Sequence, residues 1–398
     1  MIETHKIDLA TFDSIVAGQR HGLAVQTLYA SRLSRTLLLL REIAGGRPEY
    51  ADAVDTLNVA QQRDPHAVAR ILTYPWVAAW ASRCARADTS RDTHHIHGVA
   101  AAAARLVGLP MSHPAPSING WRHLPTLGRH PAELTYEQSV HRGGWQPVRR
   151  VRAGAGDFHI DIAFDDVDPF RACHNHQAAP RLDEITWQRW HTLVSQAWEL
   201  LAARAPYHAA GNAAGFRALS PLNAPPGGEV SATSSDAFGG FGASFSRSPA
   251  DFATTIVHEL RHSDINALHD LKPLYVDDTG GYFAPWRHDT RPLGAMLQGI
   301  VAFTAVASVW HAFRADASLA RHATEQFALR RLQVDRALTQ VTDAPELTVA
   351  GRRLVAGLRS TIDQLLEHSV PDRDRRYAAG RLTEIEARWL QRADARRR

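Results

Sequence analysis

Cysteine is scarce in this chain of 398 residues, which contains only Cys84 and Cys173. Two cysteines so far apart do not make the disulfide framework of a small secreted domain. No uninterrupted apolar run reaches the roughly 18 residues of a membrane-spanning helix. The best such run, 300–310, indicates a buried helix, and no secretion signal is visible at the start. From these absences we expect a cytoplasmic protein with no membrane partner.

A strong charge imbalance is also missing, because the formal net charge is only +4. Basic residues are dispersed, apart from a cluster at 373–376 and the last three arginines. A positive field can attract an acidic peptide, although a solvated arginine-rich surface is the simpler interpretation. No stripe of alternating basic and aromatic residues is present, so we expect no nucleic-acid partner.

Hydrophobic residues make up 44% of the chain, which is enough for a sizeable core. Apolar periodicity predicts many helices. We expect them at 23–44, 65–86 with an interruption near Pro75, 94–107, 183–205, 249–270, 291–314, 317–341, 346–369 and 380–395. Alternation predicts a strand at 158–164, and 216–246 suggests short strands and turns, with a turn at 239–242.

These patterns predict a mainly α-helical α+β fold, in which helix 249–270 packs against short strands and a C-terminal helical bundle follows. No polar linker is long enough to separate domains, so we expect a single unit over 1–398. Within it, 1–109 is helical, 110–246 contains the strands, and 247–398 is helical again.

The most informative motif is His258-Glu259-Leu260-Arg261-His262. Histidines four residues apart on a helix lie on one face, so both imidazoles can reach a single metal ion. In metallopeptidases the intervening Glu takes a proton from metal-bound water. The motif is short, and a salt-bridged helix with two incidental histidines is the alternative.

A third metal ligand is not evident from the spacing. The positions three and six residues after His262 hold Ile265 and Leu268, and no Glu occurs between Glu259 and Glu325. Neither common zinc peptidase pattern is therefore complete. The remaining nearby donors are Asp264, His269, His288, Asp289 and Gln298. Two His with an oxygen donor and open positions also suit Fe(II), so the metal stays open between zinc and iron.

Several separated segments resemble the α-ketoglutarate-dependent HExxH-type peptide β-hydroxylases of ribosomal peptide natural-product pathways. The resemblance runs through nearly the whole chain. It is carried by SRTLLLLR (34–41), DPHAVARILTYPWVAAW (64–80), LPTLG (124–128), DPFRACH (168–174), SAT (231–233), HELRH with NAL (258–268), WRHDTRP (286–292) and LQG (297–299).

The resemblance implies Fe(II), α-ketoglutarate as cosubstrate and O2, and hydroxylation of a β-carbon in a ribosomal precursor peptide. A radical SAM maturase is a further partner that it suggests. It places His258 and His262 on the metal, and Gln298 is our candidate for the third ligand. Glu259 would then position a water, a ligand or the substrate amide.

The far carboxylate of α-ketoglutarate requires a cation, for which arginine is best suited. The candidates are Arg287, Arg291 and Arg171, each of which can instead be a surface ion pair. Ser231 and Thr233 are candidate hydroxyl donors near the cosubstrate, or else satisfy a strand edge. His174 can orient substrate or be a buried histidine bonded to backbone.

Two other functions compete with hydroxylation. One is a zinc metallopeptidase in which Glu259 is the general base. The other is a non-catalytic peptide-binding partner of a maturase, with a degenerate metal site.

Overall fold

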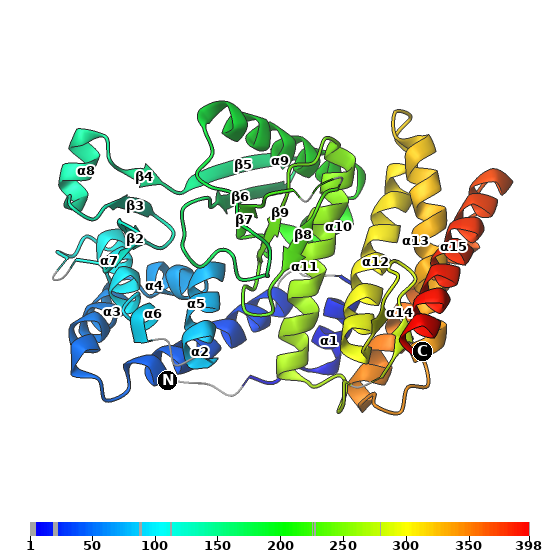
Figure 1. Ribbon diagram of the computed structural model, residues 1–398, viewed down its shortest axis with the longest axis horizontal. Helices are drawn as coiled ribbons and strands as arrows, with labels where there is room; N and C mark the ends of the chain where they lie inside the picture. Colours follow the sequence, from blue (N-terminus) through cyan, green and yellow to red (C-terminus); the bar gives the residue numbers. More distant parts are fainter. Residues whose placement is uncertain are drawn as a thin grey trace.

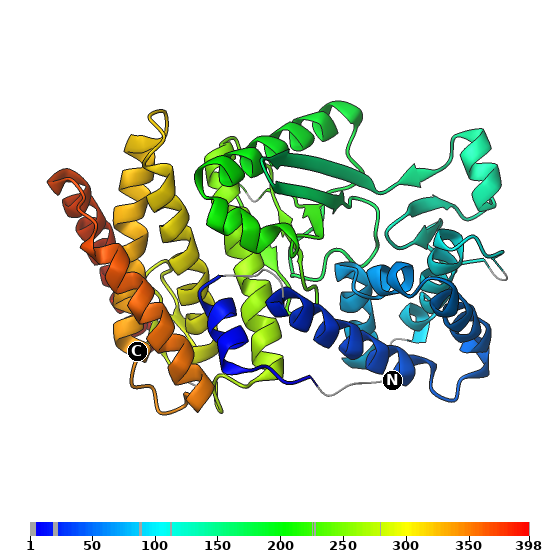
Figure 2. The same cartoon turned by 180° about the vertical axis from the view of Figure 1, so that it is seen from behind.

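The computed structural model describes residues 5–18, 23–86, 90–111, 114–224, 226, 228–278 and 280–397. The first third is helical, and the long helix α2 runs beneath it toward the middle of the molecule (Figures 1 and 2). Its elements are α1 (Leu9–Val16), α2 (Leu23–Ala44), η1 (Pro48–Tyr50), α3 (Ala51–Arg63), α4 (Pro65–Leu72), α5 (Pro75–Arg86), α6 (Ser90–Thr93) and α7 (Ile96–Leu106).

Two sheets occupy the middle of the chain. The smaller has the order β1-β2-β3-β4, and the larger has the order β5-β6-β7-β9-β8. The elements are β1 (Ser117–Ile118), β2 (Trp121–Leu124), β3 (Gly128–Pro131), α8 (Tyr136–Arg142), β4 (Gln146–Pro147), β5 (Arg149–Ala155), β6 (Phe158–Phe164), α9 (Glu184–Arg204), α10 (Pro206–Ala213), β7 (Ala218–Pro221), β8 (Ser231–Thr233) and β9 (Gly240–Ala243).

Helices return after the sheets and form the other end of the molecule (Figure 1). They follow α11, which lies between the five-stranded sheet and this C-terminal bundle. The elements are α11 (Pro249–Leu271), β10 (Tyr282–Phe283), β11 (Thr290–Arg291), α12 (Leu293–Phe313), α13 (Ala320–Val341), α14 (Val349–Glu367) and α15 (Asp372–Arg397). The mainly helical α+β class is confirmed.

The apolar residues gather into two main cores on opposite faces of the five-stranded sheet. Alternation along β6 turns Ile162 and Phe164 toward the core shared with α9 and α11. Ala163 instead faces the second core, which is built around Trp76 and Trp80 of the N-terminal helices. The sheet therefore connects the helical end of the molecule to the helix that carries the histidine motif.

One sequence prediction was wrong at the glycine-rich stretch 239–242. We expected a turn, but β9 is a buried strand between β7 and β8. A side chain on Gly240 would meet Pro75, and one on Gly242 would meet His174, so glycine is required by close packing. Only Gly239, with φ of +76°, keeps a turn conformation. The sequence also missed α1 and α3, and α15 begins at Asp372 rather than at 380.

One helix, α12, is long and apolar enough by composition to cross a membrane. However, 78% of its most apolar window is buried inside the protein. It packs against α11 and α13 and contributes Ile300 and Val309 to the larger core. This burial is what the core helix of a globular protein shows.

Candidate metal centre

The motif helix α11 begins with a well-formed N-terminus. The Ser248 side chain accepts from the backbone N–H of Asp251, and Pro249 occupies the first turn. Along the motif, successive residues then face different parts of the protein. Leu260 is fully buried in the core, and Arg261 donates to the Ile15 and Val16 carbonyls at the end of α1.

The two motif histidines converge. Nε2 of His258 and Nε2 of His262 are 3.1 Å apart, and their rings are nearly perpendicular at 89°. Two nitrogens bound at about 2.1 Å to one ion, at an angle of roughly 95°, are separated by about 3.1 Å. The pair therefore has the separation that a shared metal ion requires, which a single N–H···N hydrogen bond would also satisfy.

Gln298 lies behind His262 rather than beside the two Nε2 atoms. Its Oε1 is 2.9 Å from Nδ1 of His262, and its Nε2 donates to Oδ1 of Asn266 at 2.7 Å. Because an amide oxygen only accepts, Nδ1 of His262 carries the proton and Nε2 keeps its lone pair. In this arrangement Gln298 would orient His262 if that histidine binds a metal ion, and its role as a ligand stays a prediction.

Glu259 lines the same cavity as the histidine pair and bonds to strand β8. Its two carboxylate oxygens accept from Oγ of Ser231 and Oγ1 of Thr233, each at 2.6 Å, and the residue is only 2% exposed. Thr233 also donates to the backbone carbonyl of Glu259. The two hydroxyls that we predicted for the cosubstrate are therefore bound to Glu259, because neighbouring β8 carries them to this side of α11.

Asp264 and His269, two other candidate third ligands, have partners elsewhere in the structure. Asp264 pairs with Arg261 in the interior. His269 accepts from the backbone N–H of Leu274 through Nδ1 and does not reach the histidine pair. Among the described residues, no group of three or more His, Cys, Asp and Glu side chains is arranged to hold a metal ion. The protein thus offers two imidazoles and leaves the remaining coordination positions to other donors.

A cavity of about 650 Å³ opens beside the histidine pair. Trp286 and Phe303 form an aromatic wall, with ring centroids 4.8 Å apart, and Phe303 also contacts the His258 ring edge-on. The irregular loop before α12 contributes Trp286 and Arg287. The remaining lining comprises His176, Ser231, Ala232, Thr233, Ser235, Glu259, Asn266, Arg291, Ala295, Gln298 and Gly299.

Sequence reasoning missed His176 and Asn266 as residues of this cavity. Asn266 lies four residues after His262, so helical spacing along α11 would have found it. His176 lies in a loop, and no local pattern marks it. His174, the alternative that we considered for orienting substrate, is buried against Gly242 and does not line the cavity.

Two of the three predicted arginines face the cavity. Arg287 and Arg291 both contact Asp289, at 2.8 and 3.0 Å, so two cations share one carboxylate. Together the side chains of Arg287, Arg291 and Asp289 carry a net charge of about +1. Arg171 does not line this cavity and donates to the backbone carbonyls of Asp168 and Ala179, so the contacts favour Arg287 and Arg291.

Burial favours the neutral form of His258. The low-polarity surroundings, followed by the neighbouring His262 and Arg330, hold the pKa of His258 well below its ordinary value. Arg330 lies over the Phe303 ring, 5.2 Å from its centroid. A neutral imidazole is the form that binds metal ions, so the surroundings of His258 suit a metal ligand.

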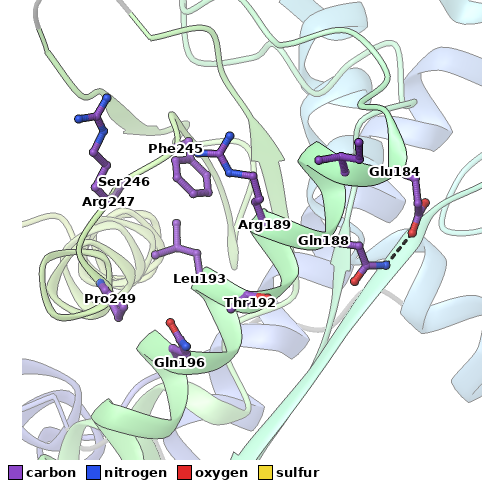
Figure 3. A pocket seen from close by; sticks show the side chains of 11 residues that line it. Glu184, Gln188, Arg189, Thr192, Leu193, Gln196, Phe245, Ser246, Arg247 and Pro249 are labelled. Atoms are coloured by element: carbon purple, nitrogen blue, oxygen red, sulfur yellow. Dashed lines mark hydrogen bonds between the residues drawn. The ribbon is translucent and has the colours of Figure 1, made fainter.

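A larger hollow of about 710 Å³ lies between α9 and the start of α11 (Figure 3). Phe245 and Arg189 meet there, with the guanidinium 4.9 Å from the ring centroid. Its lining contains no His or Cys, and Glu184 is engaged by Gln188. We place the functional site at the smaller of these two cavities, because the imidazoles of His258 and His262 and the guanidinium groups of Arg287 and Arg291 line it.

Comparison with known proteins adds no relative: no protein-family model matches the chain, and no curated protein matches it.

Proposed function

We propose that this protein is an Fe(II)- and α-ketoglutarate-dependent oxygenase that hydroxylates a residue of a peptide. The observation that carries the proposal is the convergence of the His258 and His262 Nε2 atoms at 3.1 Å, beside a cavity with an excess cation. The resemblance to the peptide β-hydroxylases supplies the reaction. A ribosomal precursor peptide, a cytoplasmic location and a maturase partner belong to the same proposal.

The donor set suits a metal that is only partly coordinated by protein. His258 and His262 would hold the ion through Nε2, and Gln298 would fix the orientation of His262 through Nδ1. When bound, Fe(II) with α-ketoglutarate and O2 would supply the oxidising chemistry that replaces a C–H bond by C–OH; one oxygen atom enters the product and the other enters succinate, with release of CO2. Two imidazoles leave positions for a bidentate cosubstrate and oxygen.

The chain's own contribution is to bind, orient and exclude water. Arg287 and Arg291 would attract the far carboxylate of α-ketoglutarate, since Asp289 compensates only one of their charges. Trp286 and Phe303 line the site on the side of His258 and reduce access of water there.

Glu259 lines the cavity, but its hydrogen bonds favour the hydroxylase over the zinc peptidase alternative. A general base must reach the water that it deprotonates. Glu259 instead accepts two short hydrogen bonds from Ser231 and Thr233 and is almost fully buried. Its role here would be to fasten β8 to α11, which is a positioning role.

The test is anaerobic reconstitution of the purified protein with Fe(II), followed by oxygen uptake with and without α-ketoglutarate. Uptake that depends on α-ketoglutarate, with succinate formed in step, is expected. Cleavage of a peptide by the zinc-loaded protein without oxygen would instead establish the peptidase. A protein that does not bind metal and does not take up oxygen would be a non-catalytic peptide-binding partner.

A further inference from the structure

Strand β8 is an edge of the five-stranded sheet. It pairs with β9 on one side, and no described strand pairs with its other side. An edge strand presents backbone N–H and C=O groups that a further extended chain can bind. Figure 1 shows β8 at the end of the sheet, next to α11.

The register determines which backbone groups face outward. Ser231 lies opposite Ala243, whose carbonyl accepts from Leu222 N at 2.7 Å on the far side of β9. One residue earlier, the Val230 carbonyl accepts from Ser244 N. Since backbone groups alternate in direction along a strand, N–H and C=O of Ser231 point away from β9.

Thr233 follows Ser231 by two residues, so its backbone groups also point outward. These groups are about 7 Å apart, the repeat of an extended chain. All three residues of β8 line the cavity beside the histidine pair. The hydroxyls of Ser231 and Thr233 hold the strand firmly to α11 through Glu259. The free edge is therefore a rigid wall of the candidate site.

We propose that the substrate peptide binds in extended form as an additional strand along the free edge of β8. This inference rests on the proposed function, whose peptide substrate it describes. The hydrogen-bonding groups of a peptide main chain complement the outward groups of Ser231 and Thr233, whatever the peptide sequence.

This mode also determines which substrate residue is presented to the metal. Residues directly opposite one another on neighbouring strands place their side chains on the same face. The side chains of Ser231 and Thr233 point toward α11, where they reach Glu259. A peptide residue opposite either of them therefore directs its β-carbon toward α11 and the histidine pair, whereas the residues on both sides of it point away.

The probe is a random library of N-acetylated hexapeptide amides, incubated with zinc-loaded protein in the absence of oxygen and α-ketoglutarate. Retained peptides are identified by mass spectrometry, and one is resynthesised with a single N-methyl group at each position in turn. We expect losses of binding with a period of two, because only alternate N–H groups face β8. Retention of no peptide, or losses without that period, would overturn the inference.

A matched pair of variants tests the protein side. Ser231→Ala removes only the hydroxyl, whereas Ser231→Pro also removes the outward N–H, which an edge strand tolerates. Peptide affinity should fall about three- to tenfold more in Ser231→Pro, while zinc affinity stays equal in the two variants. Equal peptide affinities would contradict the inference. If Ser231→Pro does not fold, the N-methyl scan on the unaltered protein still decides.

The two proposals can fail separately. Periodic peptide binding without oxygen uptake under iron conditions would leave the strand-addition inference intact and remove the hydroxylase. Hydroxylation of a peptide whose N-methyl scan shows no period of two would leave the hydroxylase and remove strand addition.

Discussion

Gln298 and His262 come from different helices, and Oε1 of Gln298 lies 2.9 Å from Nδ1 of His262. This contact selects the tautomer in which Nε2 of His262 is free to bind a metal ion. Asn266, one turn further along α11, in turn accepts from the Gln298 amide. The sequence pattern HExxH specifies the two histidines, but this relationship shows how one of them is oriented.

Replacing Gln298 by Leu should weaken Co(II) binding about ten- to hundredfold, the usual effect of losing a partner of a metal-bound histidine. At saturating Co(II), the visible spectrum should stay that of the unaltered protein, because no ligand is lost. A changed spectrum at saturation would show that Gln298 binds the metal directly. Titration against a competing chelator gives the affinity.

His258→Ala and His262→Ala should each reduce metal affinity by more than about a hundredfold. That is the upper end of the loss expected when only a hydrogen-bond partner of a metal-bound histidine is removed. His269→Ala is the matched control, since it lies on the same helix and bonds to Leu274 N instead. Metal content after dialysis measures the effect, and circular dichroism checks the helix. Full metal content in either motif variant would disprove the metal centre.

Arg291→Gln and Arg287→Gln should each raise the apparent KM for α-ketoglutarate. Losing one charge-assisted contact costs about 1.5–3 kcal/mol, which corresponds to roughly ten- to a hundredfold. Arg171→Gln should leave this KM unchanged, because Arg171 bonds to backbone carbonyls outside the cavity. An increase in KM confined to Arg171→Gln would reverse the assignment. Succinate formation at varied cosubstrate concentration supplies the measurement.

Thr233→Val should lower the free energy of unfolding by about 1–3 kcal/mol, because it leaves one buried carboxylate oxygen of Glu259 without its donor. Thr383→Val, at an exposed helix position, is the control and should change stability by less than about 0.5 kcal/mol. Urea unfolding measures both variants. Equal effects would mean that the hydroxyl contact to Glu259 contributes nothing.

Asp168 predicts a pH dependence of stability. Burial, with the nearby Asp165 carboxylate, raises its pKa from 3.8 to about 8. In the unfolded chain the carboxyl ionises near its ordinary pKa, whereas in the folded protein it stays protonated. Its contribution to stability is therefore complete below pH 3.8 and is lost as pH rises toward about 8.

Asp168→Asn should flatten this decline, since the amide oxygen can still accept from Phe170 N. The free energy of unfolding should fall less between pH 5 and pH 8 than in the unaltered protein, by a difference of more than about 1 kcal/mol. Asp343→Asn, an exposed position, should leave the decline unchanged. Identical pH profiles for Asp168→Asn and the unaltered protein would refute the raised pKa.

Local pattern was sufficient for most of the helices and for the histidine pair. The capping Ser248 and Pro249, with apolar residues at helical spacing, specify α11, and a four-residue spacing within it places two imidazoles on one face. The strand at 158–164 could also be predicted from the sequence. One face of β6 packs against α9, so apolar residues alternate with polar ones along it.

Tertiary structure decided what no local pattern encodes. The glycine-rich β9 has no side-chain signal, and only the close approach of Pro75 and His174 explains its glycines. Gln298 is far from His262 in sequence, so its contact with Nδ1 of His262 depends on how α12 packs against α11. Ser231 and Thr233 line the cavity and bond to Glu259 because sheet pairing places β8 beside α11. The sequence by itself determined the metal-binding pattern, whereas long-range packing decided which partners surround it, because these contacts join residues far apart along the chain.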